Sequence, residues 1–141
     1  MSKEKPKKKV LTPEEKEAKM QAARVYTDGL VEKALKAEQE YATFTQEQVD
    51  KIVAAAALAG SEAALTLAHE AVDETGRGVV EDKDTKNRFA TENIYNLIKN
   101  EKTVGVISED KIKGQVKIAA PLGVLAGIVP TTNPTSTTMF K

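Results

Sequence analysis

Residues 120–137 read APLGVLAGIVPTTNPTST, and this stretch decides the class of fold. The segment Leu122–Val129 is an almost uninterrupted apolar run, and its length suits a strand covered on both faces, as in a parallel α/β sheet. Pro130 closes the run. Asn133 then offers a good helix cap and Pro134 a good first helical residue, so a helix should begin there. The stretch predicts a strand, a loop and a helix of an α/β domain.

The C-terminus lies close to this motif, because Lys141 is about two turns into the expected helix. One buried strand followed by a clipped helix has no sheet to join. We therefore expect an incomplete domain, with residues 12–141 forming the N-terminal part of a larger one that is truncated naturally or by design.

The first part of the chain carries two helix starts with the same signature. Thr12 with Glu15 forms a capping box, and Thr45 with Gln48 repeats it. The first pattern predicts an amphipathic helix to about residue 41, broken or frayed near Asp28-Gly29. The second predicts a helix that is interrupted at residues 60–61.

Two more helices are expected before the pattern changes. One runs from about residue 62 to 74 on Leu65, Ala68 and Val72, and it stops at residues 75–78, where glycine relieves the left-handed cap geometry. The next spans roughly residues 81–100. Its predicted buried side chains are Phe89, Ile94, Leu97 and Ile98.

Residues 104–118 have the alternation of half-buried strands. Val104, Val106, Val116 and Ile118 alternate with other residues, and Ser108–Gly114 reads as the polar turn between two strands. The segment predicts a two-stranded antiparallel ribbon.

Composition excludes several classes of function. Basic and acidic residues balance at 21 each, so the net charge favours neither nucleic acid nor an anionic membrane. No apolar run approaches about 18 residues, so we expect no membrane span. Residues 1–11 contain five lysines within the first nine positions and predict a disordered basic leader. No apolar stretch follows them, which favours a cytoplasmic protein over a secreted one.

Few side chains of the chain suit catalysis. Cysteine is absent, which excludes disulfides, thiolate metal sites and thiol catalysis by this chain alone. His69 is the single histidine, and we assign it no role. No metal site is expected.

Residues 120–137 closely resemble the acylating aldehyde dehydrogenases. Two upstream segments, FTQEQVDKI at 44–52 and GVVEDK at 78–83, resemble the N-terminal domain of the bifunctional aldehyde–alcohol dehydrogenases. The similarity runs from about residue 37 to the end. It implies an aldehyde dehydrogenase-like α/β fold in which the chain supplies N-terminal helices, the antiparallel ribbon and the first strand of the NAD-binding sheet.

The resemblance also implies a reaction, in which acetaldehyde, coenzyme A and NAD give acetyl-CoA and NADH. In fermentation this reaction runs in reverse, in the reductive direction. In that family a cysteine thiolate attacks the aldehyde to form a thiohemiacetal, hydride leaves to NAD, and coenzyme A takes the acyl group from the thioester. The cysteine, the glycine-rich part of the dinucleotide site and the iron-dependent alcohol dehydrogenase domain lie downstream in the family, outside this sequence.

The resemblance further implies which residues meet the cofactor. The family residues that line the NAD site match Ile128, Val129, Pro130, Thr131, Thr132 and Asn133. Asn133 is the candidate oxyanion donor, because an amide NH₂ can donate to a developing negative oxygen. The chain departs from the non-acylating relatives here. They carry Pro-Trp-Asn-Phe-Pro, which aligns their oxyanion asparagine with Thr132.

Two alternatives stay open beside the acetaldehyde enzyme. One is a stand-alone acylating dehydrogenase for a longer aldehyde, and the other is a non-catalytic helical interaction module, suggested by the missing thiol and the alanine-rich helix faces. The family resemblance also implies self-association through the ribbon, into oligomers or filaments.

Overall fold

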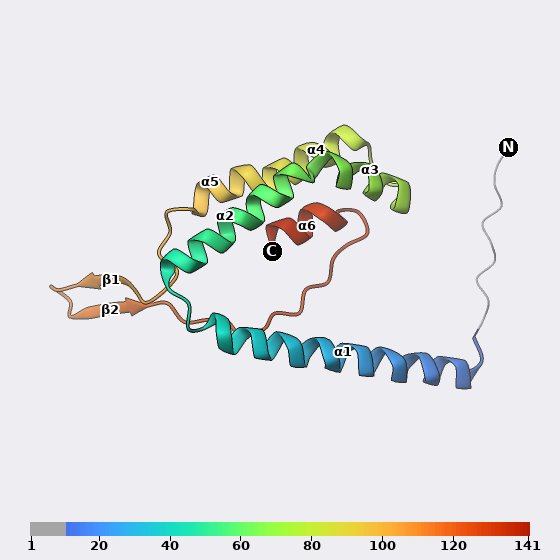
Figure 1. Cartoon of the computed structure of the whole chain (residues 1–141), viewed down its shortest axis with the longest axis horizontal. Helices are drawn as coiled ribbons and strands as arrows, with labels where there is room; N and C mark the ends of the chain where they lie inside the picture. The colour runs from blue at the N-terminus through green and yellow to red at the C-terminus, as the bar shows by residue number, and fades with distance from the viewer. Residues whose placement is uncertain (1–10) are drawn as a thin grey trace. The chain divides into compact units, whose positions relative to one another are not determined.

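The computed structural model describes residues 11–141, so the predicted basic leader lies almost wholly outside the described residues. Residues up to Tyr41 form one unit, and residues Ala42–Lys141 form a second compact unit (Figure 1). Each unit is described by itself. The second one carries every predicted site residue.

Helix α1 (Pro13–Tyr41) starts as predicted, because the backbone N–H of Glu15 donates to the Thr12 hydroxyl and the N–H of Thr12 donates to the Glu15 carboxylate. The break expected near Asp28-Gly29 was wrong, since the helix runs through it unbroken. One glycine costs about 1 kcal/mol relative to alanine, and the good helix formers around it offset that cost. No residue within Pro13–Tyr41 is buried.

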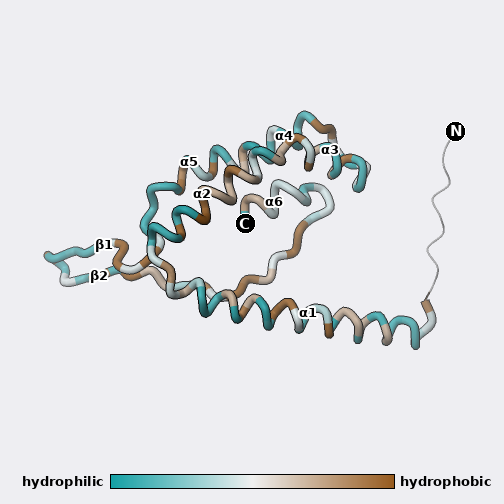
Figure 2. The backbone as a smooth tube through the Cα atoms, viewed as in Figure 1, coloured by the Kyte–Doolittle hydropathy of each residue, from teal (hydrophilic) through white to brown (hydrophobic). Residues whose placement is uncertain are grey.

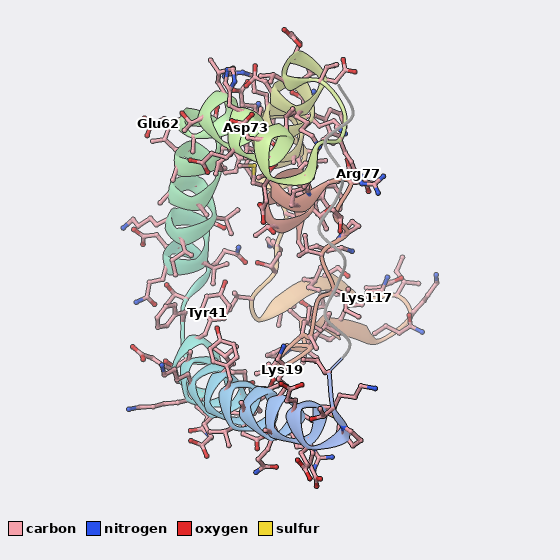
Figure 3. All side chains as sticks on the ribbon, turned by 90° about the vertical axis from the view of Figure 1, so that its right-hand side faces the viewer. Lys19, Tyr41, Glu62, Asp73, Arg77 and Lys117 are labelled. Atoms are coloured by element: carbon pink, nitrogen blue, oxygen red, sulfur yellow. The ribbon has the colours of Figure 1, made fainter. Side chains whose placement is uncertain are left out.

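Helices α2 (Gln46–Glu62) and α3 (Ala64–Thr75) follow, with the predicted capping box at Thr45 and Gln48. Their axes bend by 61°, and the bend lies at Ala63 rather than at residues 60–61. Gly76 ends α3 with φ +63°, as the stop signal predicted. The charged side chains of Glu62, Asp73 and Arg77 are exposed and point outward (Figure 3).

The predicted helix over residues 81–100 forms as three joined pieces. They are α4 (Val80–Arg88), a π-helical turn η1 (Phe89–Asn93) and α5 (Ile94–Ile98). The predicted buried set was largely wrong: Phe89 is 52% exposed and Leu97 is 71% exposed. The extra residue in the π turn rotates the helix face, and π turns often occur at functional sites. Side chains of Lys83, Asn87, Ala90 and Thr91 are buried instead.

The core of the second unit is built from small residues. Its buried apolar members are Val49, Ala64, Ala68, Ala71 and Ala90. The face predicted for α3 shifts accordingly, because Leu65 is half exposed while the alanines pack against α4. Alanine faces allow helices to approach closely. At Gly60 an added Cβ would lie 2.7 Å from Cγ2 of Thr91, so only glycine fits this contact.

Strands β1 (Val106–Asp110) and β2 (Gln115–Ile118) form the predicted antiparallel ribbon, although β1 extends three residues further than expected. Val106 pairs with Ile118 and Asp110 with Gln115, with an irregularity near Ser108. Gln46 ties the start of α2 to the segment before β1. Its side-chain oxygen accepts from the N–H groups of Thr103 and Val104, each at 2.9 Å.

The predicted strand Leu122–Val129 was wrong for this chain, because residues 119–130 form neither helix nor strand within the described structure. A strand needs a neighbour for its N–H and C=O groups, and no other described segment pairs with this one. Leu122 is 86% exposed and Ile128 is 97% exposed. Figure 2 shows the apolar colour of this segment, which leads into helix α6 (Pro134–Phe140). The start of α6 at Pro134 agrees with the prediction.

No single helix among residues 11–141 is long and apolar enough to cross a membrane. The bent pair α2 and α3 satisfies that test only jointly, by length and composition.

Candidate functional site

The six predicted cofactor-binding residues lie together in the loop that precedes α6. The backbone N–H of Asn133 donates to the carbonyl of Pro130 at 3.1 Å, which closes the turn. Ile128 and Val129 expose their side chains on the approach to this turn. Thr131 and Thr132 are exposed, and Asn133 is half-buried. The loop therefore offers apolar surface followed by hydroxyl and amide groups.

Asn133 occupies the cap position of α6, as predicted, but its side chain bonds to Lys86 instead of capping the helix. The ammonium of Lys86 donates to Oδ1 of Asn133 at 2.6 Å. The amide Nδ2 donates at 3.3 Å to the hydroxyl of Thr132. The cap contact is lost because Asn133 has φ −140° and ψ 59°, outside the extended conformation usual for a capping residue.

Lys83 holds the backbone of the same loop. Its ammonium donates to the carbonyl oxygen of Thr132 at 2.9 Å, and the residue is only 4% exposed. A hydrogen bond from a charged donor contributes roughly 1.5–3 kcal/mol, which offsets part of the cost of burying the charge. Gly78 lies beside this lysine, since a Cβ there would come within 3.4 Å of Cε of Lys83.

Asn87 joins three helices at the centre of the unit. It is fully buried, and its Nδ2 donates to the carbonyl of Ala64 on α3 at 2.9 Å. Its Oδ1 accepts from the hydroxyl of Thr135 on α6 at 2.8 Å. Its backbone carbonyl accepts from the hydroxyl of Thr91, also at 2.9 Å. Asn87 thereby fixes where α6 begins, and hence where the loop ends.

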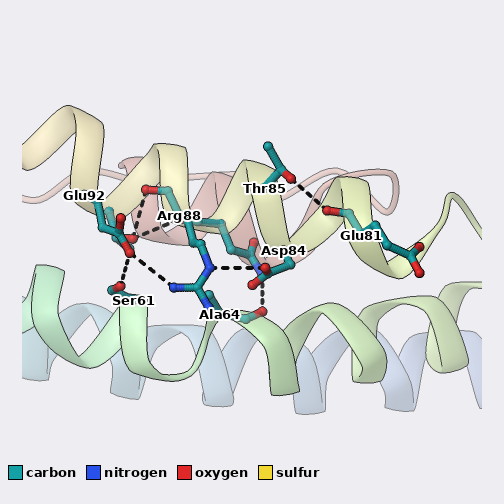
Figure 4. Close-up of polar contacts among 9 residues, drawn as sticks. Ser61, Ala64, Glu81, Asp84, Thr85, Arg88 and Glu92 are labelled. Atoms are coloured by element: carbon teal, nitrogen blue, oxygen red, sulfur yellow. Dashed lines mark hydrogen bonds and ion pairs between the residues drawn. The ribbon is translucent and has the colours of Figure 1, made fainter.

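An ion-pair network covers the other face of α4 (Figure 4). Arg88 donates to Asp84 at 3.1 Å and to Glu92 at 3.3 Å, and the hydroxyl of Ser61 donates to Glu92. The hydrogen bond and the negative charge of Asp84 raise the pKa of Arg88 above its ordinary value, and Glu92 adds to this effect. Partial burial of Arg88 acts in the opposite direction. The network links α2 to α4 and η1 at the surface and does not reach the loop.

Sequence reasoning missed Lys83, Lys86 and Asn87 as residues of the site. The available signal was their spacing of three and four positions, which places them on one face of the predicted helix. Nothing in the sequence pairs that face with residues 132–135, because the partners lie 47–49 positions away. His69 is exposed on α3.

Comparison with known proteins shows the family to which the chain belongs. No protein-family model matches the chain. The bifunctional aldehyde–alcohol dehydrogenase of Escherichia coli is 60% identical over 114 residues, which make up 81% of this chain and 13% of that protein. The crystal structure of an acetylating aldehyde dehydrogenase from Geobacillus thermoglucosidasius superposes with a TM-score of 0.78 at 48% identity, covering 85% of this chain and 26% of that one. The chain belongs to the acylating aldehyde dehydrogenase family.

The chain is also similar to a relative that is named for another aldehyde substrate. The acetylating succinate-semialdehyde dehydrogenase of Clostridium kluyveri is 43% identical over 110 residues, or 78% of this chain and 24% of that protein. The chain spans about an eighth to a quarter of the length of these relatives. The predicted family and the incomplete α/β fold are confirmed, with the helices and the ribbon in place.

The loop of this chain carries apolar and amide groups of the kind that one wall of a dinucleotide site requires. Ile128 and Val129 offer apolar contact to a flat ring, and the carboxamide of Asn133 offers a donor beside it. Residues that could enclose a pyrophosphate are absent from this loop, so the fit is partial. Among the described residues, no three histidine, cysteine, aspartate or glutamate side chains gather where they could hold a metal ion.

Proposed function

We propose that this chain is the N-terminal part of an acylating aldehyde dehydrogenase that interconverts acetaldehyde, coenzyme A and NAD⁺ with acetyl-CoA and NADH. In fermentation the reaction runs in the reductive direction, from acetyl-CoA to acetaldehyde. The observation that supports this most is the structural match to a solved acetylating aldehyde dehydrogenase, at 48% identity over 85% of the chain.

Residues Ile128–Asn133 line one side of the proposed NAD site. When bound, NAD supplies the hydride acceptor for the oxidation of the aldehyde carbon. Ile128 and Val129 exclude water from one face of the site, and Pro130 fixes the direction in which the loop turns. Thr131 and Thr132 present hydroxyl groups that can accept or donate hydrogen bonds to polar parts of the cofactor.

Asn133 has a proposed part in the chemistry. Attack of a thiolate on the aldehyde carbon places negative charge on the aldehyde oxygen, and an amide N–H directed at that oxygen stabilises the charge. In the acylating aldehyde dehydrogenases this thiolate belongs to a cysteine, and this chain has none. The chain's contribution is therefore a wall of the cofactor site and one hydrogen-bond donor.

The experiment is an assay of the complete enzyme that contains this chain. NADH formation from acetaldehyde should depend on coenzyme A and should give acetyl-CoA as the product. NADH formation at full rate without coenzyme A, with acetate as the product, would contradict the proposal. Comparison of acetaldehyde with succinate semialdehyde separates the first function from the longer-aldehyde alternative, which the relative from Clostridium kluyveri supports.

The non-catalytic helical module remains the competing proposal from another class. It rests on the alanine-rich core of α2 and α3 and on the missing thiol. It predicts that residues 1–141 form a stable folded monomer, whereas the enzyme proposal predicts poor solubility because Leu122, Leu125 and Ile128 are more than two-thirds exposed. Sedimentation and thermal unfolding of the purified chain distinguish the two.

Self-association of the complete enzyme is a further part of the proposal. The ribbon exposes Val106, Val116 and Ile118, each more than half accessible, along its edges and faces. A two-stranded ribbon is marginally stable by itself in water, and exposed edges pair readily with another chain. The cytoplasmic location stays a prediction.

A further inference from the structure

One face of α4 carries three side chains that each hold a different part of the loop. Lys83 binds the carbonyl of Thr132, Lys86 binds the carboxamide of Asn133, and Asn87 binds the hydroxyl of Thr135. Lys83 and Asn87 are buried, at 4% and 0% exposure. Lys83 holds the backbone carbonyl just before Asn133, and Asn87 holds the side chain of Thr135 just after it. The chief freedom left to Asn133 is rotation of its own side chain.

Lys86 removes that freedom by simple chemistry. An ammonium group has three donors and no acceptor, so the amide atom that lies 2.6 Å from it must be the oxygen. The NH₂ group then has to face the other way. One of its two hydrogens meets the hydroxyl of Thr132 at the long distance of 3.3 Å, which leaves the second hydrogen available to a ligand.

We infer that Lys86 is a positioning residue, which holds the Asn133 carboxamide by its oxygen so that the NH₂ group is directed away from the ammonium and has one hydrogen available to a ligand. The positive charge of the ammonium beside the carbonyl oxygen also draws electrons from the amide nitrogen, which makes the N–H a better donor. The inference deepens the proposed function and rests on it for the role of Asn133. The contact itself can be tested without any catalysis.

The first test uses the complete enzyme that contains this chain, labelled with ¹⁵N in the asparagine side chains, and follows their NH₂ resonances. K86M removes the charged donor and keeps the aliphatic stem, so it should shift the Asn133 resonances more than those of any other asparagine. K86R keeps a charged donor and should restore most of the shift. The matched control is K99M, because Lys99 donates to Oδ1 of Asn96 at 2.9 Å in an equivalent exposed pair. K99M should shift Asn96 and leave Asn133 unchanged.

A second variant keeps the test decisive if K86M does not fold. N133D places a carboxylate against the ammonium, and an opposite charge within hydrogen-bond distance lowers the pKa of a carboxyl group. The introduced carboxyl should titrate at lower pH in N133D than in N133D/K86Q. Equal titration in these two variants, or an unmoved Asn133 resonance in folded K86M, would overturn the inference.

Kinetics of the complete enzyme separate this inference from the proposed function. K86M should lower kcat roughly tenfold, less than the 10²–10³-fold expected for loss of an oxyanion donor in N133A, while KM for NAD changes little. K86R should recover most of the loss. Unchanged kcat in N133A would refute the catalytic role of Asn133, and with it the part of Lys86 in the reaction, even where the resonances confirm the contact. Normal kcat in K86M with an impaired N133A would refute Lys86 alone.

Discussion

Replacement of Asn87 with alanine should destabilise the second unit of the chain, because this side chain of α4 hydrogen-bonds to both α3 and α6. Asn87 is fully buried and makes one bond to the Ala64 carbonyl and one from the Thr135 hydroxyl, at 2.9 and 2.8 Å. N87A removes both bonds at once. It also leaves the hydroxyl of Thr135 without this partner at a half-buried position.

The magnitude follows from these two contacts. Each neutral hydrogen bond contributes about 0.5–1.5 kcal/mol, so the pair accounts for about 1–3 kcal/mol. The vacated carboxamide volume adds a cavity cost of some tenths of a kcal/mol, at about 24 cal/mol per Å³. We therefore expect N87A to reduce the free energy of unfolding of residues 42–141 by about 2 kcal/mol. Such a change corresponds to roughly 30-fold faster amide exchange in the helices of this unit.

Hydrogen exchange resolved by residue is the suitable assay, because it reports α3 and α4 separately from α1. N93A is the matched control, since Asn93 is exposed on η1 and should change exchange less than about twofold. T135V removes only the second bond, and the double variant N87A/T135V should show a coupling of about 0.5–1.5 kcal/mol. An N87A variant with exchange rates within threefold of the parent chain would refute the reasoning, and so would strict additivity with T135V.

The purified 141-residue chain should form no NADH from acetaldehyde and coenzyme A, because it has no thiol to form a thiohemiacetal; turnover above a protein-free blank would contradict this. The same chain should bind NAD weakly or undetectably by calorimetric titration, since only one wall of the proposed site is present, and micromolar affinity would argue otherwise. G60A should lower stability by about 1–3 kcal/mol in thermal unfolding, because its Cβ would lie 2.7 Å from Cγ2 of Thr91; G29A, where nothing lies within 4 Å, is the control and should be neutral or stabilising. V116K/I118K in the complete enzyme should weaken the self-association seen by sedimentation, because each unpaired charge buried at the interface costs about 1–3 kcal/mol. Both residues are exposed in this chain, so helical content should not change. An unaltered oligomer would mean that the ribbon packs within its own subunit.

Local sequence determined the ends of the elements. Capping boxes at Thr12 and Thr45, the stop at Gly76 and the start of α6 at Pro134 all lie where the sequence predicts them. These signals act between residues no more than four positions apart, so they are legible without the fold. The ribbon is similar, because its alternation and its turn lie within 15 residues.

Which faces are buried was decided by the tertiary structure. The π turn at Phe89–Asn93 rotates the helix that follows it, and Leu97 faces solvent. Asn87, before the turn, and Thr91, within it, are buried. Hydropathy alone favours the opposite arrangement. This polar face can be buried because backbone carbonyls and hydroxyl groups of other elements form hydrogen bonds with its side chains. The periodicity of the sequence does not reveal those partners.

The candidate site divides in the same way. The sequence alone placed Pro130–Asn133 in a loop before a helix, with Ile128 and Val129 at the end of a strand. The assignment of these six residues to a cofactor site came from the resemblance to the acylating aldehyde dehydrogenases. The bonds that hold Thr132 and Asn133 come from Lys83 and Lys86, 49 and 47 positions earlier, and arise only when α4 packs beside α6. Leu122–Val129 shows the converse, since its composition suits a buried strand but no described segment supplies the neighbouring hydrogen bonds. A helix satisfies its backbone within itself, whereas a strand requires a partner from elsewhere in the fold.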